Sequence, residues 1–281
     1  MNENRLGFMQ GRLSEMVAGK MQSFPWNAWE QEFEIAPHIP INLMEWTLDH
    51  ERLYENPLLT SAGQKKIRFL SQKYAVTVPS LTADCFMQAP FWKSTGVVRD
   101  KLLQEFIDVV SACKNVGIGI IVVPLVDNGS LESEAQEQDI VQTLLNHINL
   151  FCDNRLRIAF ESDYAPLKLQ QFISRLPSGY FGVNFDMGNS AGLGFDSSHE
   201  FGLYGDRIIN VHVKDRIHNG STVPLGLGSV DFSKVFLGLE NINYQGNFIL
   251  QTARFEGDIN CELIKKYKDM TLKMILANTK K

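Results

Sequence analysis

The stretch of the chain that decides the fold is residues 208–216, which read IINVHVKDR. From position 209 to position 214 apolar and polar residues alternate, and a period of two residues is typical of a β-strand. The alternation predicts that Ile209 shares one face with the two valines and that His212 lies on the other face. A buried strand with a polar residue near its C-terminal end is typical of the mouth of a βα-barrel. A lone histidine in a strand is more often an ordinary hydrogen-bonded residue, so the rest of the chain has to decide.

Segments of this kind recur along the whole chain and alternate with helical patterns. Strands are predicted at residues 5–9, 41–46, 75–81, 117–124, 156–161, 181–186, 208–216 and 247–251. Helices are predicted at residues 25–35, 61–74, 97–115, 134–151, 166–176, 198–204, 232–239 and 261–276. Such alternation indicates an α/β fold with a parallel sheet and right-handed crossovers.

Eight such units in fewer than 300 residues favour a closed (β/α)8 barrel over an open sheet, and such a barrel needs about 250 residues. The first strand is not followed by a GxGxxG sequence, so the main sign of a dinucleotide-binding fold is missing. The chain has no linker, low-complexity tract or short repeat. We therefore expect one domain over residues 1–281.

Composition excludes several classes of partner. The net charge of −5 argues against a non-specific nucleic-acid binder, and no apolar run approaches the roughly 20 residues of a membrane span. The four cysteines form no CxxC pattern, and no apolar segment typical of a signal peptide follows Met1. We expect reduced, mostly buried thiols in a cytoplasmic protein with no nucleic-acid or membrane partner. The sequence is compatible with a homo-oligomer but does not decide the question.

Polar residues stand at the ends of the last four predicted barrel strands. They are Glu161, Asp186, His212 and Gln251. Because the C-terminal ends of barrel strands converge at one rim, these side chains should meet there. Oxygen and nitrogen donors without a thiolate suit Mn²⁺, Mg²⁺, Co²⁺ or Zn²⁺. Each residue also has an ordinary role open to it: a helix cap for Asp186, a lysine partner for Glu161, and backbone hydrogen bonds for Gln251.

Several motifs resemble the xylose isomerase-like TIM-barrel superfamily, in its branch of sugar-phosphate isomerases and epimerases. They are FE at 160–161, NFDMGN at 184–189, HVKDR at 212–216, and VPLGLGSVDF at 223–232. The last is similar to the family's Pro-x-Gly-x-Gly-x-x-Asp-Phe turn. GFMQGRL at 7–13 looks like the opening of a bacterial subgroup. The resemblance covers essentially the whole chain, although the first half matches more by strand order than by motif.

The resemblance implies one divalent ion held by Glu161, Asp186 and His212. Gln251 stands where the family has a fourth ligand, a glutamate, and this is a departure. In the family's epimerases two glutamates flank the substrate, one removing a proton and the other returning it. An amide oxygen can bind a metal but cannot take up a proton, which puts a two-glutamate epimerisation in doubt. Asn189 likewise stands where the family often has a second histidine.

The resemblance also implies an activity: metal-dependent isomerisation or epimerisation of a small sugar or sugar phosphate through an enediolate. Glu161 is the expected base, and the ion would act as a Lewis acid. Lys214 and Arg216 could hold an anionic group or polarise an oxygen, unless both are solvated loop residues. The remaining residues expected to contact or shape the sugar pocket are Glu45, Trp46 and Asn189.

Two other functions stay open. A dehydratase of a keto-sugar or inosose would use the same intermediate but lose a hydroxyl group. A metal- or sugar-binding protein that has lost catalysis is also compatible with Gln251. An endonuclease-like role is disfavoured, because the chain is acidic and lacks the richer His and Glu set of a trinuclear zinc site.

Overall fold

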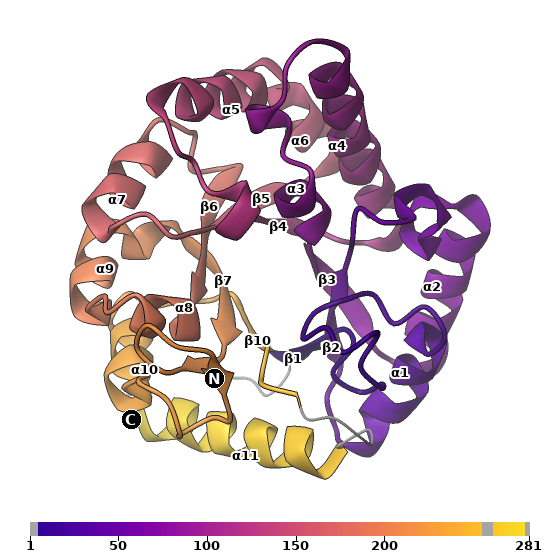
Figure 1. Cartoon of the computed structure of the whole chain (residues 1–281). Coiled ribbons are helices and arrows are strands. Elements are labelled where there is room, and N and C mark those ends of the chain that lie inside the picture. Colours follow the sequence, from indigo (N-terminus) through magenta and orange to yellow (C-terminus); the bar gives the residue numbers. More distant parts are fainter. Residues whose placement is uncertain (1–4, 255–260, 279–281) are drawn as a thin grey trace.

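Eight parallel strands form a closed barrel in the computed structural model, which describes residues 5–254 and 261–278 (Figure 1). The order around the barrel is β1-β10-β7-β6-β5-β4-β3-β2. The strands are β1 (Leu6–Met9), β2 (Leu43–Thr47), β3 (Thr77–Thr82), β4 (Ile120–Leu125), β5 (Arg157–Ser162), β6 (Phe181–Asp186), β7 (Ile208–Val213) and β10 (Asn247–Leu250). The structure confirms the predicted (β/α)8 barrel and all eight of its strands.

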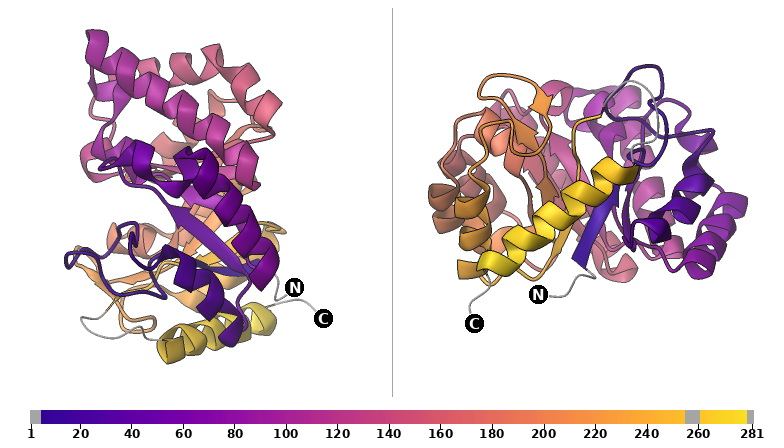
Figure 2. Two further views of the ribbon diagram at one scale, coloured as in Figure 1. Left: turned by 90° about the vertical axis from the view of Figure 1, so that its right-hand side faces the viewer. Right: turned by 90° about the horizontal axis from the view of Figure 1, so that it is seen from below.

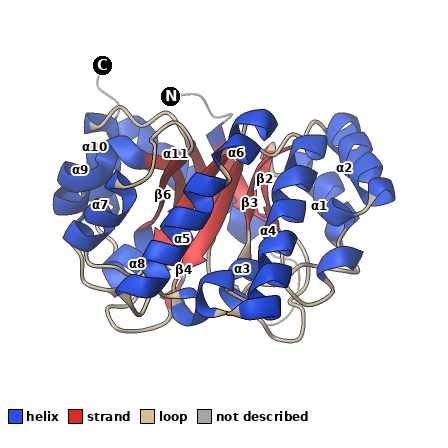
Figure 3. Ribbon diagram, turned by 90° about the horizontal axis from the view of Figure 1, so that it is seen from above, coloured by secondary structure: helices blue, strands red, loops and turns tan. Residues whose placement is uncertain are grey.

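Helices surround the barrel on its outside, as Figures 2 and 3 show. The longer ones are α1 (Trp29–Ile35), α2 (Ser61–Tyr74), α4 (Gly96–Val116), α5 (Glu134–Asn146), α6 (Ile148–Asn154), α7 (Pro166–Ser174), α9 (Ser197–Tyr204), α10 (Phe232–Asn241) and α11 (Cys261–Asn278). Single 3₁₀ turns occur at Ala36–His38, Leu53–Glu55, Pro57–Leu59, Phe91–Lys93, Asp127–Gly129 and Gly205–Arg207. The apolar faces of these helices and the outer faces of the strands bury one continuous core.

Several predicted boundaries were wrong. The first helix begins at Trp29 rather than Pro25, and the helix predicted over 134–151 is interrupted where His147 leaves helical backbone angles (φ −105°, ψ 18°). Two short helices were not predicted, α3 (Asp84–Gln88) after β3 and α8 (Met187–Gly192) after β6. The strand predicted over 208–216 ends at Val213. Beyond it, β8 (Asp215–Arg216) pairs with β9 (Thr222–Val223) in a small antiparallel ribbon.

The alternation expected in β7 fails at Ile209. The register between β6 and β7 shifts at this point, since Val183 pairs with Ile208 but Asn184 pairs with Asn210. The extra residue turns Ile209 inward, where it packs against a small apolar cluster of Ile120, Val122 and Ala159. Val211 and Val213 belong to the outer core, so the prediction of a face shared with Ile209 was wrong. Beyond the shift, Asn210 and His212 face the barrel interior, as their hydrogen bonds there show.

The expectations drawn from composition agree with the structure only in part. No helix in residues 5–254 and 261–278 is long and apolar enough to span a membrane. The four cysteines are unpaired, as expected. Cys85 and Cys113 are buried, but Cys152 is exposed and Cys261 is partly exposed, so "mostly buried" was only half right.

Candidate active site

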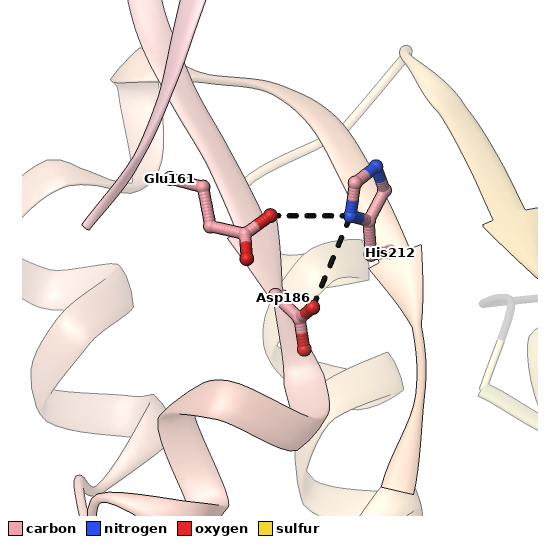
Figure 4. A group of neighbouring side chains, drawn as sticks. All are labelled: Glu161, Asp186 and His212. Atoms are coloured by element: carbon pink, nitrogen blue, oxygen red, sulfur yellow. Dashed lines mark ion pairs between the residues drawn. The ribbon is translucent and has the colours of Figure 1, made fainter. Parts of the chain in front are cut away.

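Three predicted ligands meet at the C-terminal mouth of the barrel. Glu161 ends β5, Asp186 ends β6, and His212 lies near the end of β7, on three neighbouring strands (Figure 4). His212 Nδ1 lies 3.3 Å from Glu161 Oε2 and 3.9 Å from Asp186 Oδ2. One ligand atom from each residue lies within 4.8 Å of the others. Three such atoms are close enough together to bind one cation.

Gln251 follows β10, the next strand around the barrel, and its backbone N–H donates to Val213 O at 3.1 Å. Its side-chain oxygen Oε1 is buried, and within the described part of the chain it accepts no hydrogen bond. An unpaired buried acceptor is costly, and such groups usually have a partner. Two carboxylates, an imidazole and this amide oxygen form a donor set that fits a divalent ion in both charge and chemistry.

A further carboxylate, that of Glu45, orients His212 from below. Glu45 on β2 is fully buried, and its Oε1 lies 2.7 Å from His212 Nε2. The same carboxylate accepts hydrogen bonds from Ser80 Oγ at 2.6 Å, Thr82 Oγ1 at 2.5 Å and Asn210 Nδ2 at 2.9 Å. When Nε2–H donates a hydrogen bond to this carboxylate, Nδ1 carries the free lone pair. Metal-binding histidines commonly have such a carboxylate partner on the nitrogen that does not bind the ion.

The electrostatics of this cluster are dominated by negative charge. Burial lowers the pKa of His212, but the charges and hydrogen bonds of Glu45 and Glu161 outweigh burial and raise it to about 10. Burial raises the pKa of Glu161, but His212 and then Lys214 hold it below its ordinary value. Burial also raises the pKa of Asp186, an effect that Lys214 opposes and Glu161 reinforces. The surroundings of the histidine therefore favour a positive charge at the mouth.

Asn189 connects the candidate metal ligands to the basic residues of the mouth. Its Nδ2 donates to Glu161 Oε1 at 2.5 Å, and its Oδ1 accepts from Lys214 Nζ at 3.1 Å and Arg216 Nη1 at 3.0 Å. Lys214 Nζ also lies 3.2 Å from Asp186 Oδ2. The other Asp186 oxygen caps α8 through Asn189 N at 2.8 Å. Asp186 therefore caps a helix, the ordinary role that the sequence left open for it, and also lies among the candidate metal ligands.

A pocket of about 460 Å³ opens above these residues, within the size range of small-molecule sites. Its lining includes Glu161, Asn189, Lys214, Arg216 and Gln251. On the far side it includes Gln22, Thr82, Asp84, Met87, Pro124, Val126 and Asp127. Two of the predicted ligands, Glu161 and Gln251, thus border one cavity together with the two basic residues, although they lie up to 90 positions apart in the sequence. Asp186 and His212 are buried behind this lining.

Two residues expected to shape the sugar pocket do not line this cavity. Glu45 lies below the mouth with no exposed surface and is fully occupied by its hydrogen bonds. Trp46 points outward into the helical layer, where it packs against Phe24 and Trp29 and donates from Nε1 to Asn56 Oδ1 at 3.2 Å. The expectation failed because neighbouring strand residues point to opposite faces and here neither reaches the mouth.

The Pro-x-Gly-x-Gly segment has a structural explanation. The Asp215 carboxylate is fully buried and accepts hydrogen bonds from Gly226 N and Gly228 N at 2.9 Å and from Val230 N at 3.2 Å. A Cβ at Gly228 would lie 2.1 Å from Asp215 Oδ1, so only glycine allows this approach. The interaction fixes the loop beside Arg216 at the pocket wall.

A sequence model described as xylose isomerase-like TIM barrel matches residues 33–269. The chain belongs to this family. The SgbU protein of Escherichia coli (strain K12), named as a candidate L-ribulose-5-phosphate 3-epimerase, is 24% identical over 238 residues, which is 80% of this chain and 83% of SgbU.

Two solved structures have a fold similar to that of this chain. A zinc-bound IolI protein superposes with a TM-score of 0.76 at 15% identity, covering 99% of this chain and 100% of IolI. A D-psicose 3-epimerase with D-tagatose, from Clostridium cellulolyticum H10, gives a TM-score of 0.74 at 10% identity, covering 98% and 100%. At such identities these likenesses show the fold alone.

Sequence reasoning missed two features of this xylose isomerase-like site. The contact of Glu45 with His212 joins residues 167 positions apart, and only the closed barrel brings them together. Asp84 lies at the start of a five-residue helix whose sequence carries no strong helical pattern. Its position directly after the third predicted strand was the only available signal.

Proposed function

We propose that this chain is a divalent-metal-dependent epimerase or isomerase of a small ketose or ketose phosphate. The observation that carries the proposal is the convergence of Glu161, Asp186 and His212 beside an unpaired Gln251 oxygen at the mouth of the barrel. The relatives support the same class, because SgbU is named as a candidate sugar-phosphate epimerase and several structural neighbours are titled sugar epimerases.

Glu161 is the proposed base. Its two oxygens accept from Asn184 Nδ2 at 2.8 Å and Asn189 Nδ2 at 2.5 Å, which fixes the carboxylate at the pocket wall. Its lowered pKa keeps it ionised, so it can accept a proton from the carbon beside the sugar carbonyl. A bound divalent ion supplies Lewis acidity that makes this carbon more acidic. In an epimerase a proton then arrives at the same carbon from the opposite face, and in an isomerase the abstracted proton is delivered to the neighbouring carbon.

Lys214 and Arg216 are proposed to bind the oxygens of the substrate. Both line the pocket, and Asn189 holds both heads at its rim. Lys214, beside the metal ligand Asp186, is placed to stabilise a developing oxyanion. Arg216 lies further along the same wall and is suited to a phosphate or a distal hydroxyl group.

The test uses solvent deuterium. The metal-loaded protein is incubated in D₂O with L-ribulose 5-phosphate, D-tagatose, D-psicose and D-fructose, and products are followed by NMR and mass spectrometry. We expect deuterium at the carbon next to the carbonyl in at least one sugar, with an epimer or isomer of unchanged formula apart from the label. Glu161→Gln should reduce exchange by about 100-fold or more.

Glu134→Gln is the matched control, because Glu134 is exposed in the first turn of α5 on the outside of the barrel. It should exchange at the wild-type rate. Unchanged exchange in Glu161→Gln would eliminate Glu161 as the base. A product lighter by one water would instead identify a dehydratase.

A further inference from the structure

Asp84 is a buried carboxyl group in the pocket that no step described above uses. It is the second residue after β3, lines the cavity, and is only 8% exposed. Across residues 5–254 and 261–278 its carboxyl group takes part in no hydrogen bond, although buried carboxylates of structural importance usually have several. Asp49, its nearest acidic neighbour in electrostatic terms, is by contrast bonded to Ser23, Phe24 and Gln88. Hydrogen bonding within the described residues therefore does not account for the buried Asp84 carboxyl group, which lies in the first turn of α3.

The barrel order places Asp84 on the wall that a substrate must use. The proposed ligands come from β5, β6, β7 and β10, which are consecutive around the barrel. A sugar bound beside the ion therefore contacts the other half, formed by β1, β2, β3 and β4. Two carboxyl groups from that half line the cavity, Asp84 and Asp127, and Asp127 is exposed. Asp84 is the buried one.

The surroundings of Asp84 suit a group that gives and takes protons. Burial raises its pKa to about 8, with further raising contributions from Asp49 and Glu161 and opposing ones from His212 and Lys214. Arg12 also interacts electrostatically with it. A carboxyl group that is largely protonated near neutral pH can act as an acid, and a pKa near the working pH is what proton transfer in both directions requires.

Inversion of configuration at a carbon atom needs two proton-transfer groups, one on each face. The proton leaves from one face, and a different proton must arrive on the other face. Glu161 can serve one face, but Gln251 has no proton-accepting group for the other. Asp84 approaches the cavity from β3, separated from β5 by β4, and so reaches a bound sugar from another direction than Glu161 does.

We propose that Asp84 is the second proton-transfer residue and that this chain is an epimerase; this rests on the proposed function. Glu161 removes the proton beside the carbonyl, and the C–H electron pair forms the C=C bond of the enediolate. Asp84 then delivers its O–H proton to the same carbon from the opposite face, and the carbonyl re-forms. The step leaves Glu161 protonated and Asp84 ionised. Glu161 then loses its proton to solvent and Asp84 takes one up from solvent, which restores the starting state. No oxidant or reductant is needed.

The experiment measures solvent deuterium incorporation and epimer formation separately in Asp84→Asn. This isosteric change removes the transferable proton. With the epimer whose C–H faces Glu161, this variant should still incorporate solvent deuterium at a rate within about threefold of wild type. Formation of the other epimer should fall by about 100-fold or more. With the opposite epimer as starting material, both exchange and inversion should be lost.

Asp100→Asn, an exposed position on α4, is the matched control and should behave as wild type in both assays. Thermal unfolding and Mn²⁺ affinity of Asp84→Asn should be close to wild type, which excludes loss of the fold or of the ion. Epimerisation at the wild-type rate would overturn the proposal, as would equal loss of exchange and inversion from both epimers. If wild type itself exchanges none of the sugars, the proposed function fails before Asp84 is tested.

Discussion

The orientation of His212 is set by Glu45, a residue that does not line the pocket. Its ring is fully buried, with Nε2 against Glu45 and Nδ1 towards Glu161 and Asp186. Glu45 is itself held by Ser80, Thr82 and Asn210, three donors from two other strands. Since a rigid partner on one nitrogen fixes the direction of the other, affinity for an ion depends on this layer as well as on the ligands.

Glu45→Gln tests that dependence. The amide can present an NH₂ group to His212 Nε2 and allow the wrong tautomer, so we expect affinity for Mn²⁺ to fall about 10- to 100-fold. Isothermal titration of the EDTA-treated protein measures it. Glu105→Gln is the control, because Glu105 is a buried carboxylate bonded to His50 Nε2 at 2.9 Å on the outer helix α4. Equal affinities in the two variants would contradict an orienting role for Glu45.

The residues of the site were only partly predictable from the sequence. Glu161, Asp186 and His212 could be found because each stands at the end of a readable apolar strand, where barrel geometry requires convergence. Asp84 was not singled out, and Glu45 was expected in the sugar pocket rather than behind His212, since both positions depend on which side chains turn inward in a given register. Trp46 was expected to shape the sugar pocket, but its side chain lies in the helical layer, as its hydrogen bond to Asn56 shows.

At the scale of elements, α1 is tied to the loop after β1 by one buried carboxylate. Glu32 has no exposed surface, and its oxygens accept from Gly11 N at 2.9 Å and Leu13 N at 2.8 Å. Burial raises its pKa to about 7, although the backbone donors, Ser14 and Arg254 oppose the rise, and Arg12 also interacts with its charge. The folded protein therefore binds this proton more tightly than the unfolded chain does, whose glutamate pKa is near 4.5.

The contribution of Glu32 to stability should accordingly be complete below about pH 4.5 and be lost as the pH rises through about 7. Glu32→Gln, which keeps an acceptor oxygen but does not titrate, should gain stability relative to wild type by about 3 kcal/mol between pH 4.5 and pH 8. Urea denaturation across this range measures the difference. A difference that stays constant with pH would contradict the raised pKa.

The elements themselves divide into those that sequence patterns specify and those that tertiary structure imposes. The eight strands and the long helices follow from periodicity. The inward turn of Ile209 follows from a register shift between β6 and β7, which requires knowledge of both strands. The ribbon of β8 and β9 depends on Asp215, whose hydrogen bonds to Gly226 and Gly228 span a loop that no local pattern predicts.

The whole molecule supplies what no single element can. Closure of the barrel brings Glu161, Asp186, His212 and Gln251 to four neighbouring strand ends. The same closure places Asp84 on the opposite side of the cavity and Glu45 beneath it. The lower interior is apolar and the upper interior is a hydrogen-bonded polar layer, so the barrel is both a packed core and the support of the site.

Every proposed step depends on the binding of one divalent ion by Glu161, Asp186 and His212. The most direct measurement is isothermal titration of Mn²⁺ into EDTA-treated wild type, Asp186→Asn and the surface control Asp100→Asn. We expect one ion to bind per chain in wild type and in the control. The affinity of Asp186→Asn for Mn²⁺ should be weaker than that of wild type by a factor on the order of a hundred or more. Absence of binding in wild type, or equal affinity in all three proteins, would contradict this expectation.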